Sequence, residues 1–245
     1  MKSFLSSKHI PVRERLIFAL DVPSFKEAQS MIDRLGDSVC FYKLGLQLFM
    51  TGEYFKLVEK LQSLQKKIFV DLKFFDVPET VKNAVEQLQI RNITFATVHG
   101  NDDIMSAAAS VKGDTKILAV TVLTSLDEGD MKDLGFDCDV QQLVLSRARR
   151  ALTLGCDGVI SSGLEVRELR ENLDEKLLVI TPGIRPASNV WTKDDQKRIV
   201  TVQDAFFNGA DYVVVGRPIR SAADPRMAAE EIQQQIEAVF NTTAS

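Results

Sequence analysis

The chain has 245 residues, of which 45% are hydrophobic and 26% charged, and its formal net charge is −4. This composition suits a folded chain with a large core, and the length is typical of an α/β barrel that forms a single domain. A mildly acidic chain argues against a nucleic-acid partner, because it offers no polyanion-binding surface.

The N-terminal segment, residues 1–15, carries scattered charges and no apolar signal core. We interpret it as a short arm before the first strand of a single domain spanning residues 1–245. No apolar run in the sequence reaches the roughly 18 residues that a membrane span needs, so no membrane partner is expected. The three cysteines, Cys40, Cys138 and Cys156, have no metal-binding or disulfide spacing and indicate reduced thiols in the cytoplasm.

Short apolar runs recur along the chain after this arm. They are rich in Val, Ile, Leu and Phe and alternate little with polar residues, which is typical of strands buried on both faces. We expect strands at Leu16–Val22, Phe41–Gly45, Lys67–Lys73, Ile93–His99, Lys116–Thr124, Gly158–Ser162, Leu177–Gly183 and Tyr212–Arg217.

Between these runs, apolar residues recur three and four positions apart, as they do in amphipathic helices. Eight strands alternating with helices predict a parallel sheet, and this length favours a closed single (β/α)8 TIM barrel. A doubly wound open sheet is the alternative that periodicity leaves open. The longest expected loop is Thr181–Lys197, and loops of that length are usually functional. Helices are expected at Ser24–Leu35, Gly52–Gln65, Glu79–Arg91, Val140–Leu154, Leu164–Leu173 and Val202–Asn208.

Polar residues stand at or near the ends of the expected strands, where this fold carries its active sites. Aspartates, lysines and arginines gather there in larger number than a merely solvated rim requires. His99 is interpreted as a packing residue at the end of the fourth strand. The set comprises Asp21, Lys43, Asp71, Lys73, Asp76, His99, Thr124, Ser125, Ser161, Ser162, Arg185 and Arg217.

The third expected strand and the residues after it give the sharpest signal. Asp71 and Lys73 stand two apart, so both side chains point into the barrel mouth. Lys43 ends the neighbouring strand, and with Asp76 the four residues predict a row of alternating charge. A structural ion-pair network is the alternative, but buried charges are costly unless paired, and four of them favour a functional site. A lysine between carboxylates stays protonated, which suits a proton donor.

The seventh and eighth expected strands are followed by a second signal. Arg185 follows Pro-Gly after strand seven, and Gly216-Arg217-Pro follows strand eight. Barrels commonly bind phosphate at these two loops, where a glycine admits an anion to the backbone and arginines pair with phosphate oxygens. A plain turn is the alternative, but the location and the two arginines favour a phosphorylated small molecule.

These segments together resemble bacterial orotidine 5′-phosphate decarboxylases, from Leu16 to about Pro225. Their order and spacing are specific, whereas the Asp-x-Lys-x-x-Asp pattern alone is shared by related barrels. The matching segments are Phe18–Val22, Lys43–Gly45, Asp71–Thr80, Ala119–Ser125, Thr181–Pro186 and Val215–Pro218.

The resemblance implies a carboxy-lyase that converts orotidine 5′-phosphate to uridine 5′-phosphate and CO2, the last step of de novo pyrimidine biosynthesis. It implies that Lys73 protonates C6 of the pyrimidine and that Asp71 lies beside the substrate carboxylate. Asp21 and Lys43 would contact the ribose. Asp76 would reach the site of a neighbouring subunit, which implies a homodimer with shared active sites.

The resemblance also assigns the rest of the substrate site. Thr80 would join Asp76 in the neighbouring subunit's site, and Thr124 would contact the pyrimidine. The interval from Arg185 to Gln196 is a couple of residues longer than the commonest bacterial pattern, which weakens the assignment of Gln196. The phosphate end would be formed by Arg185, Gln196, Gly216 and Arg217.

No dinucleotide fingerprint, P-loop or metal-ligand cluster is found in the sequence, so neither a cofactor nor a metal is expected. A metal-dependent sugar-phosphate enzyme resembling hexulose-phosphate synthase is the nearest alternative. Those relatives place a carboxylate where Lys43 stands, and a lysine there repels a divalent cation. The other alternative is a non-catalytic barrel that binds a nucleotide phosphate, against which the four-residue charged set speaks.

Overall fold

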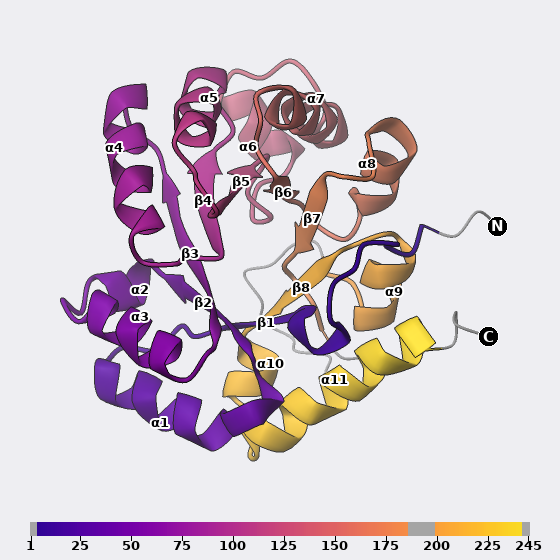
Figure 1. The fold of residues 1–245 in the computed structure, drawn as a ribbon. Helices are drawn as coiled ribbons and strands as arrows, with labels where there is room; N and C mark the ends of the chain where they lie inside the picture. Colours follow the sequence, from indigo (N-terminus) through magenta and orange to yellow (C-terminus); the bar gives the residue numbers. More distant parts are fainter. Residues whose placement is uncertain (1–3, 186–198, 242–245) are drawn as a thin grey trace.

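The structure of the chain is a computed structural model that describes residues 4–185 and 199–241. Parallel strands pair in sequence order and β8 pairs with β1, so the sheet closes into an eight-stranded barrel (Figure 1). This confirms the predicted TIM barrel, and the open doubly wound sheet is wrong. The strands are β1 Leu16–Ala19, β2 Phe41–Gly45, β3 Lys67–Phe74, β4 Phe95–His99, β5 Lys116–Val120, β6 Gly158–Ile160, β7 Leu178–Thr181 and β8 Tyr212–Val215.

Helices surround the barrel (Figure 1). The six helices predicted from periodicity are confirmed to within two residues at either end. Within the described ranges, none of the helices is long and apolar enough to span a membrane. The helices are α1 Phe25–Leu35, α2 Leu46–Phe49, α3 Tyr54–Ser63, α4 Pro78–Gln89, α5 Asp102–Ser110, α6 Glu128–Asp133, α7 Val140–Thr153, α8 Val166–Asn172, α9 Val202–Phe207, α10 Arg217–Arg220 and α11 Pro225–Asn241, with 3-10 turns at η1 Val12–Glu14 and η2 Gly36–Ser38.

Several strands are shorter than predicted. β1 ends at Ala19 and β5 at Val120, because the apolar residues beyond them leave the sheet and enter the loops of the barrel mouth. Val122 shows this, since it stays buried although it pairs with no strand in the described structure. The predicted strand ends therefore supply walls of the mouth rather than further hydrogen-bonded sheet.

Aromatic rings fill the barrel interior. The ring centroid of Phe95 lies 5.0 Å from that of Phe41 and 5.1 Å from that of Tyr212, and Phe69 packs against the same ring. A second apolar layer packs between the outer faces of the strands and the helices. The filled interior leaves the two ends of the barrel as places where a ligand can bind.

The N-terminal arm is fixed to the amino-terminal end of the barrel. Asp211, fully buried before β8, forms ion pairs with Lys8 at 3.0 Å and with Arg170 at 2.7 Å. The hydroxyl of Ser6 donates to the same carboxylate. The backbone N–H of Val179 adds a further donor at 2.9 Å, so the buried charge is paired from the arm, from α8 and from β7.

Candidate active site

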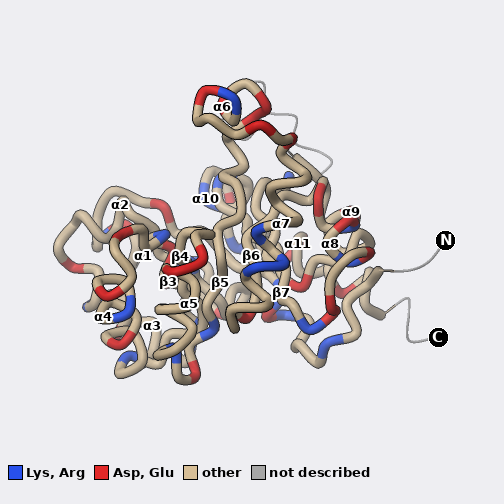
Figure 2. Tube along the Cα trace, turned by 90° about the horizontal axis from the view of Figure 1, so that it is seen from above, with Lys and Arg blue, Asp and Glu red and all other residues tan. Residues whose placement is uncertain are grey.

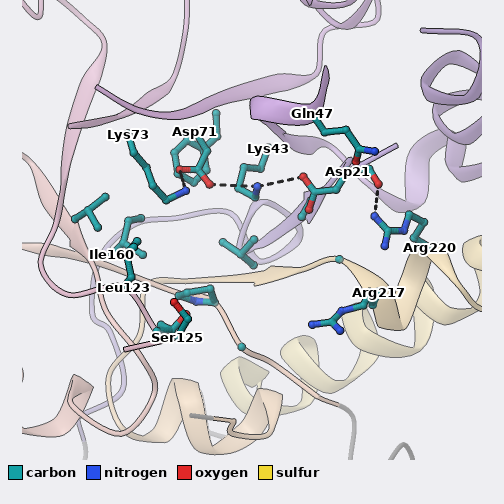
Figure 3. A pocket seen from close by; sticks show the side chains of 18 of the residues that line it. Asp21, Lys43, Gln47, Asp71, Lys73, Leu123, Ser125, Ile160, Arg217 and Arg220 are labelled. Atoms are coloured by element: carbon teal, nitrogen blue, oxygen red, sulfur yellow. Dashed lines mark hydrogen bonds and ion pairs between the residues drawn. The ribbon is translucent and has the colours of Figure 1, made fainter. Parts of the chain in front are cut away.

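A cavity of about 580 Å³ opens at the carboxyl ends of the strands (Figure 3). Five cationic side chains and two carboxylates line it, although the chain as a whole is acidic. Figure 2 shows α6, which follows the β5 residues of this rim, projecting beyond the barrel body. The polar lining residues are Asp21, Lys43, Gln47, Asp71, Lys73, Thr124, Ser125, Arg185, Arg217 and Arg220.

Four charged side chains, from β2, β3 and the loop after β1, form a continuous row along one wall of the cavity (Figure 3). Lys73 Nζ lies 2.9 Å from Asp71 Oδ1, and Asp71 Oδ2 lies 3.2 Å from Lys43 Nζ. Lys43 Nζ in turn lies 3.5 Å from Asp21 Oδ1. The charges alternate, so each buried charge has a partner of opposite sign.

The surroundings of Asp71 and Lys43 keep both groups ionised. Burial by itself would raise the pKa of the Asp71 carboxyl, but Lys43, Lys73 and the Thr97 hydroxyl outweigh burial and hold it at about 2. Burial would likewise lower the pKa of Lys43, but Asp71 and Asp21 raise it above its ordinary value. Asp71 and Lys43 are therefore an oppositely charged pair at neutral pH.

The backbone at the end of β3 aims these side chains. The pairing of β3 with β4 shifts between Val70 and Phe74, and Lys73 adopts a left-handed backbone conformation with φ 48°. The Lys73 N–H donates to Thr97 Oγ1 on β4 at 3.0 Å, and that hydroxyl donates to Asp71 Oδ1 at 3.0 Å. The expected common direction of Asp71 and Lys73 is thus reached through a bulge rather than by plain strand alternation.

Gly45 leaves space for the contact between Lys43 and Asp21 at one end of the row. A Cβ added at this position would lie 3.2 Å from Asp21 Oδ1 and 3.5 Å from Lys43 Nζ. A side chain there would push against the carboxylate and ammonium that meet beside it. Glycine at the end of β2 therefore lets the Lys43 ammonium meet the Asp21 carboxylate from the loop after β1.

Three arginines also line the cavity. Arg185 follows β7, and its backbone N–H donates to Val200 O at 3.0 Å, which anchors the first residues of the loop. Arg217 and Arg220 both lie on α10, which follows Gly216. Arg220 donates to the backbone oxygen of Asp21, so it links α10 to the end of β1 (Figure 3).

Within one chain, Asp76 does not join Lys43, Asp71 and Lys73, and its place in that network stays a prediction. Among the described residues the row runs from Lys73 toward Asp21 instead. Asp76 is exposed, and its Oδ1 accepts from the Val77 N–H at 2.7 Å, because the bulge turns the chain outward into α4. Thr80 is likewise exposed, on the first turn of α4.

The structure places the remaining predicted residues as follows. Thr124, Gly216, Arg217 and Arg185 line the cavity, whereas Gln196 lies outside the described residues. The ring of His99 stacks on Phe75 with centroids 4.3 Å apart and hydrogen-bonds Asn101 at 2.7 Å, as a packing residue would.

Sequence reasoning missed three residues of the site. Thr97 stands two residues before His99 on β4, so strand alternation places it on the same face, which was the available signal. Arg220 follows Arg217 by one helical turn, which again places both on one face. Gln47 lies on α2, a short helix directly after β2 that apolar periodicity did not predict.

Fold and site together define a (β/α)8 barrel with a charged cavity at the carboxyl ends of its strands. A family model described as "Orotidine 5'-phosphate decarboxylase / HUMPS family" matches residues 14–232. The chain therefore belongs to this family, which confirms the resemblance read from its motifs.

Curated relatives and solved structures of similar sequence extend over nearly the whole chain. An orotidine 5′-phosphate decarboxylase of Methylococcus capsulatus is 65% identical over 98% of this chain and 99% of its own length. That of Stenotrophomonas maltophilia is 46% identical over 95% and 97%. The crystal structure of the Lactobacillus acidophilus orotidine 5′-phosphate decarboxylase matches with a TM-score of 0.80 at 35% identity, covering 91% of this chain and 99% of that one.

Proposed function

We propose that this chain decarboxylates orotidine 5′-phosphate to uridine 5′-phosphate, the last step of de novo pyrimidine biosynthesis, without a metal or cofactor. The observation that carries the proposal is the ion-paired Lys73–Asp71–Lys43 row on the wall of the cavity. The excess of cationic side chains in that cavity also matches a substrate with a phosphate and a carboxylate.

Lys73 supplies the positive charge that the reaction needs. When the bond between C6 and the substrate carboxylate breaks, CO2 leaves and the electron pair stays on C6. The Lys73 ammonium, held 2.9 Å from Asp71, stabilises that charge and then transfers a proton to C6. The neutral amine left behind regains its proton from water. Asp71, ionised at neutral pH, fixes the ammonium and lies beside the carboxylate that departs.

The rest of the cavity holds the substrate. Asp21 and Lys43 are proposed to contact the ribose and Thr124 the pyrimidine, and all three line the cavity. The phosphate is assigned to the arginine side, at Arg217 and Gly216, with Arg185 shaping the same end. Gln196 is kept as a phosphate ligand on the resemblance alone.

Two such chains are proposed to form a homodimer with shared active sites. Asp76 and Thr80 face solvent in one chain, next to the exposed apolar side chains of Phe75 and Val77. Apolar side chains exposed beside polar residues are typical of a protein interface. Asp76 would then complete the charge row of the partner's site.

Mixing two inactive variants tests the shared site. Lys73→Ala and Asp76→Ala each remove one residue of the proposed shared active site. If Asp76 acts across the interface, a mixed dimer contains one site in which both residues are intact. Dissociation and reassociation should then restore about a quarter of the wild-type activity. Mixtures that stay as inactive as the separate variants would show that Asp76 does not act in the partner's site.

The proposed reaction is tested by adding orotidine 5′-phosphate and following the loss of its ultraviolet absorbance. Wild-type protein should consume the substrate, and Lys73→Ala should lose several orders of magnitude in kcat while still binding uridine 5′-phosphate. Lys176→Ala is the matched control, because Lys176 is an exposed lysine in a loop before β7. Absence of turnover by the wild-type protein would overturn the proposed function.

The metal-dependent sugar-phosphate alternative is disfavoured by Lys43, whose ammonium lies between the carboxylates of Asp71 and Asp21 and repels a divalent cation. Activity that EDTA abolishes would favour that alternative. We also propose that residues 1–245 act as one barrel domain with residues 1–15 as its arm. The three free cysteines support an assignment to the cytoplasm.

A further inference from the structure

Thr97 lies outside the charge row but forms hydrogen bonds with two members of the row, Asp71 and Lys73. It lies on β4 and is fully buried. Its hydroxyl donates to Asp71 Oδ1 at 3.0 Å and accepts the backbone N–H of Lys73 at 3.0 Å. A single oxygen atom therefore contacts both the carboxylate of the row and the backbone that carries the ammonium.

The backbone of Lys73 needs such support. Its φ of 48° lies in the left-handed region of backbone conformation, which residues other than glycine rarely adopt. The register of β3 against β4 is interrupted between Val70 and Phe74, so the strand ladder does not hold this residue in place. The Thr97 hydroxyl takes the place of the missing ladder acceptor and pairs an N–H that would otherwise lack a bond.

The same hydroxyl also orients the carboxylate. Asp71 Oδ1 receives both the Thr97 hydroxyl and the Lys73 ammonium at 2.9 Å, while Oδ2 receives Lys43 at 3.2 Å. With Oδ1 bonded from β4 and Oδ2 from β2, the plane of the carboxylate is fixed. The position of the Lys73 ammonium relative to the cavity follows from that plane and from the bulged backbone together.

We propose that Thr97 is a positioning residue for decarboxylation, setting the ammonium of Lys73 by holding both its backbone and its carboxylate partner. The inference rests on the proposed function for the reaction it serves. Thr97 does not line the cavity among the described residues, so it acts through Asp71 and Lys73 and not by touching the substrate.

The test compares Thr97→Val with Thr97→Ser. Valine keeps the branched shape and removes the hydroxyl, whereas serine keeps the hydroxyl and removes a methyl group. Since a misplacement of about 1 Å at a reacting group costs up to roughly 100-fold, Thr97→Val should lower kcat by about 10- to 100-fold. Its affinity for uridine 5′-phosphate should stay within about twofold, because the binding groups are untouched, and Thr97→Ser should keep kcat within about threefold of wild type.

Thr121→Val is the matched control. Thr121 is equally buried, and its hydroxyl donates to Ile160 O at 3.0 Å, away from the charge row. It should lose stability as a buried threonine does but keep kcat close to wild type. If Thr97→Val does not fold, Thr97→Ala tests the same loss of the hydroxyl with a smaller side chain. A Thr97→Val enzyme with normal kcat, or a Thr97→Ser enzyme as slow as the valine variant, would overturn the proposal.

Amide hydrogen exchange separates this inference from the proposed function. The Lys73 N–H should exchange faster in Thr97→Val and at the wild-type rate in Thr97→Ser, whether or not the protein decarboxylates orotidine 5′-phosphate. If the wild-type protein has no activity but the two variants show this exchange pattern, the proposed function is contradicted and the positioning of Lys73 by Thr97 is supported. Unchanged Lys73 exchange in Thr97→Val contradicts the positioning itself.

Discussion

Asp71 is shared between two ammonium groups, at 2.9 Å from Lys73 and 3.2 Å from Lys43. Its carboxylate is the only anion of the row that both lysines contact in the described structure, so its ionisation sets the charge of the cavity wall. Burial opposes that ionisation and the two lysines favour it, and the lysines prevail. The balance has a measurable consequence for stability at low pH.

The free energy of unfolding should fall as Asp71 becomes protonated. Its pKa is about 2 in the folded chain against an ordinary 3.8, so its contribution is fully present above the ordinary value. It is lost as the pH falls from about 4 to about 2. Asp71→Asn should remove about 2 kcal/mol of this pH dependence in denaturant titrations at stepped pH.

Asp102→Asn serves as the control for that titration. Asp102 pairs with Arg150 at 2.6 Å, but both side chains are about half exposed, so the pair contributes little. Its removal should leave the acid dependence nearly unchanged. An Asp71→Asn profile parallel to the wild-type profile over the same range would show that the row does not depress the carboxyl pKa.

The signs of the charges at the mouth could be predicted from residue spacing, but their geometry could not. Asp71 and Lys73 stand two apart on an apolar strand, which places both on one face. The left-handed φ of Lys73 depends on a hydroxyl from β4, a tertiary contact that spacing along β3 does not contain. Strand alternation could place Thr97 on the same face as His99, but its contacts with Asp71 and Lys73 exist only once β3 and β4 are side by side.

The segments after β7 and β8 bring Arg185 and Arg217 to the cavity, and Figure 3 shows Arg217, on the α10 side, apart from the lysine row. In the proposed reaction the phosphate lies on this side, remote from the bond that breaks. Binding energy from such a remote group can be used to lower the barrier of the chemical step. The phosphate is therefore expected to have a large effect on kcat/KM, although it does not take part in the chemical step.

Removing the substrate phosphate should lower kcat/KM, and Arg217→Ala should lower it only for the phosphorylated substrate. We expect Arg217→Ala to lose roughly 10- to 100-fold with orotidine 5′-phosphate, as charged hydrogen bonds are lost, and little with orotidine. Steady-state kinetics with both substrates checks this, with Arg149→Ala, an exposed arginine on α7, as control. Equal losses on both substrates would place Arg217 elsewhere than at the phosphate.

Helices could be predicted where an apolar stripe is strong, and the prediction was weakest where the stripe is made of alanine. α5 buries Ile104, Met105 and Ala108, and its alanine-rich sequence gave little contrast. α11 was missed although Ile232, Ile236 and Val239 have helical spacing. Its residues lie beyond the last strand, where no further strand marks a repeating unit.

The two ends of the barrel serve different purposes in the whole molecule. The carboxyl end holds charged groups that line a cavity. The amino end holds Asp211, buried beneath the N-terminal arm and paired with Lys8 and Arg170. In this fold, polar residues at the amino end are linked to stability and those at the carboxyl end to chemistry.

Asp211→Asn should therefore destabilise the chain without changing the chemistry. It leaves two cations without their common partner, and breaking a buried pair costs about 3–5 kcal/mol. Glu171→Gln, which breaks the exposed pair with Arg167, should cost less than about 1 kcal/mol. Denaturant unfolding measures both, and kcat of each folded variant should match wild type. A similar loss of unfolding free energy in both variants would mean that the ion pairs of Asp211 do not stabilise the fold more than an exposed pair does.

The barrel as a whole could be predicted because it repeats one local pattern, an apolar strand followed by an amphipathic helix. The place of Asp76 could not, because a single chain turns it outward at the start of α4. In the proposed homodimer a second chain would bring Asp76 to a site, which the family resemblance implies and residue spacing along one chain does not. Gln196 lies beyond Arg185 in residues whose place the structure does not describe.

The central claim is that the Lys73 ammonium reaches the carbon that loses CO2. A crystal structure of the chain with a uridine 5′-phosphate analogue measures the separation of Lys73 Nζ from C6 of the pyrimidine directly. We predict a separation of roughly 3 Å, with the Nζ still bonded to Asp71. An ammonium that points away from the ring, or lies more than about 5 Å from C6, would contradict the account.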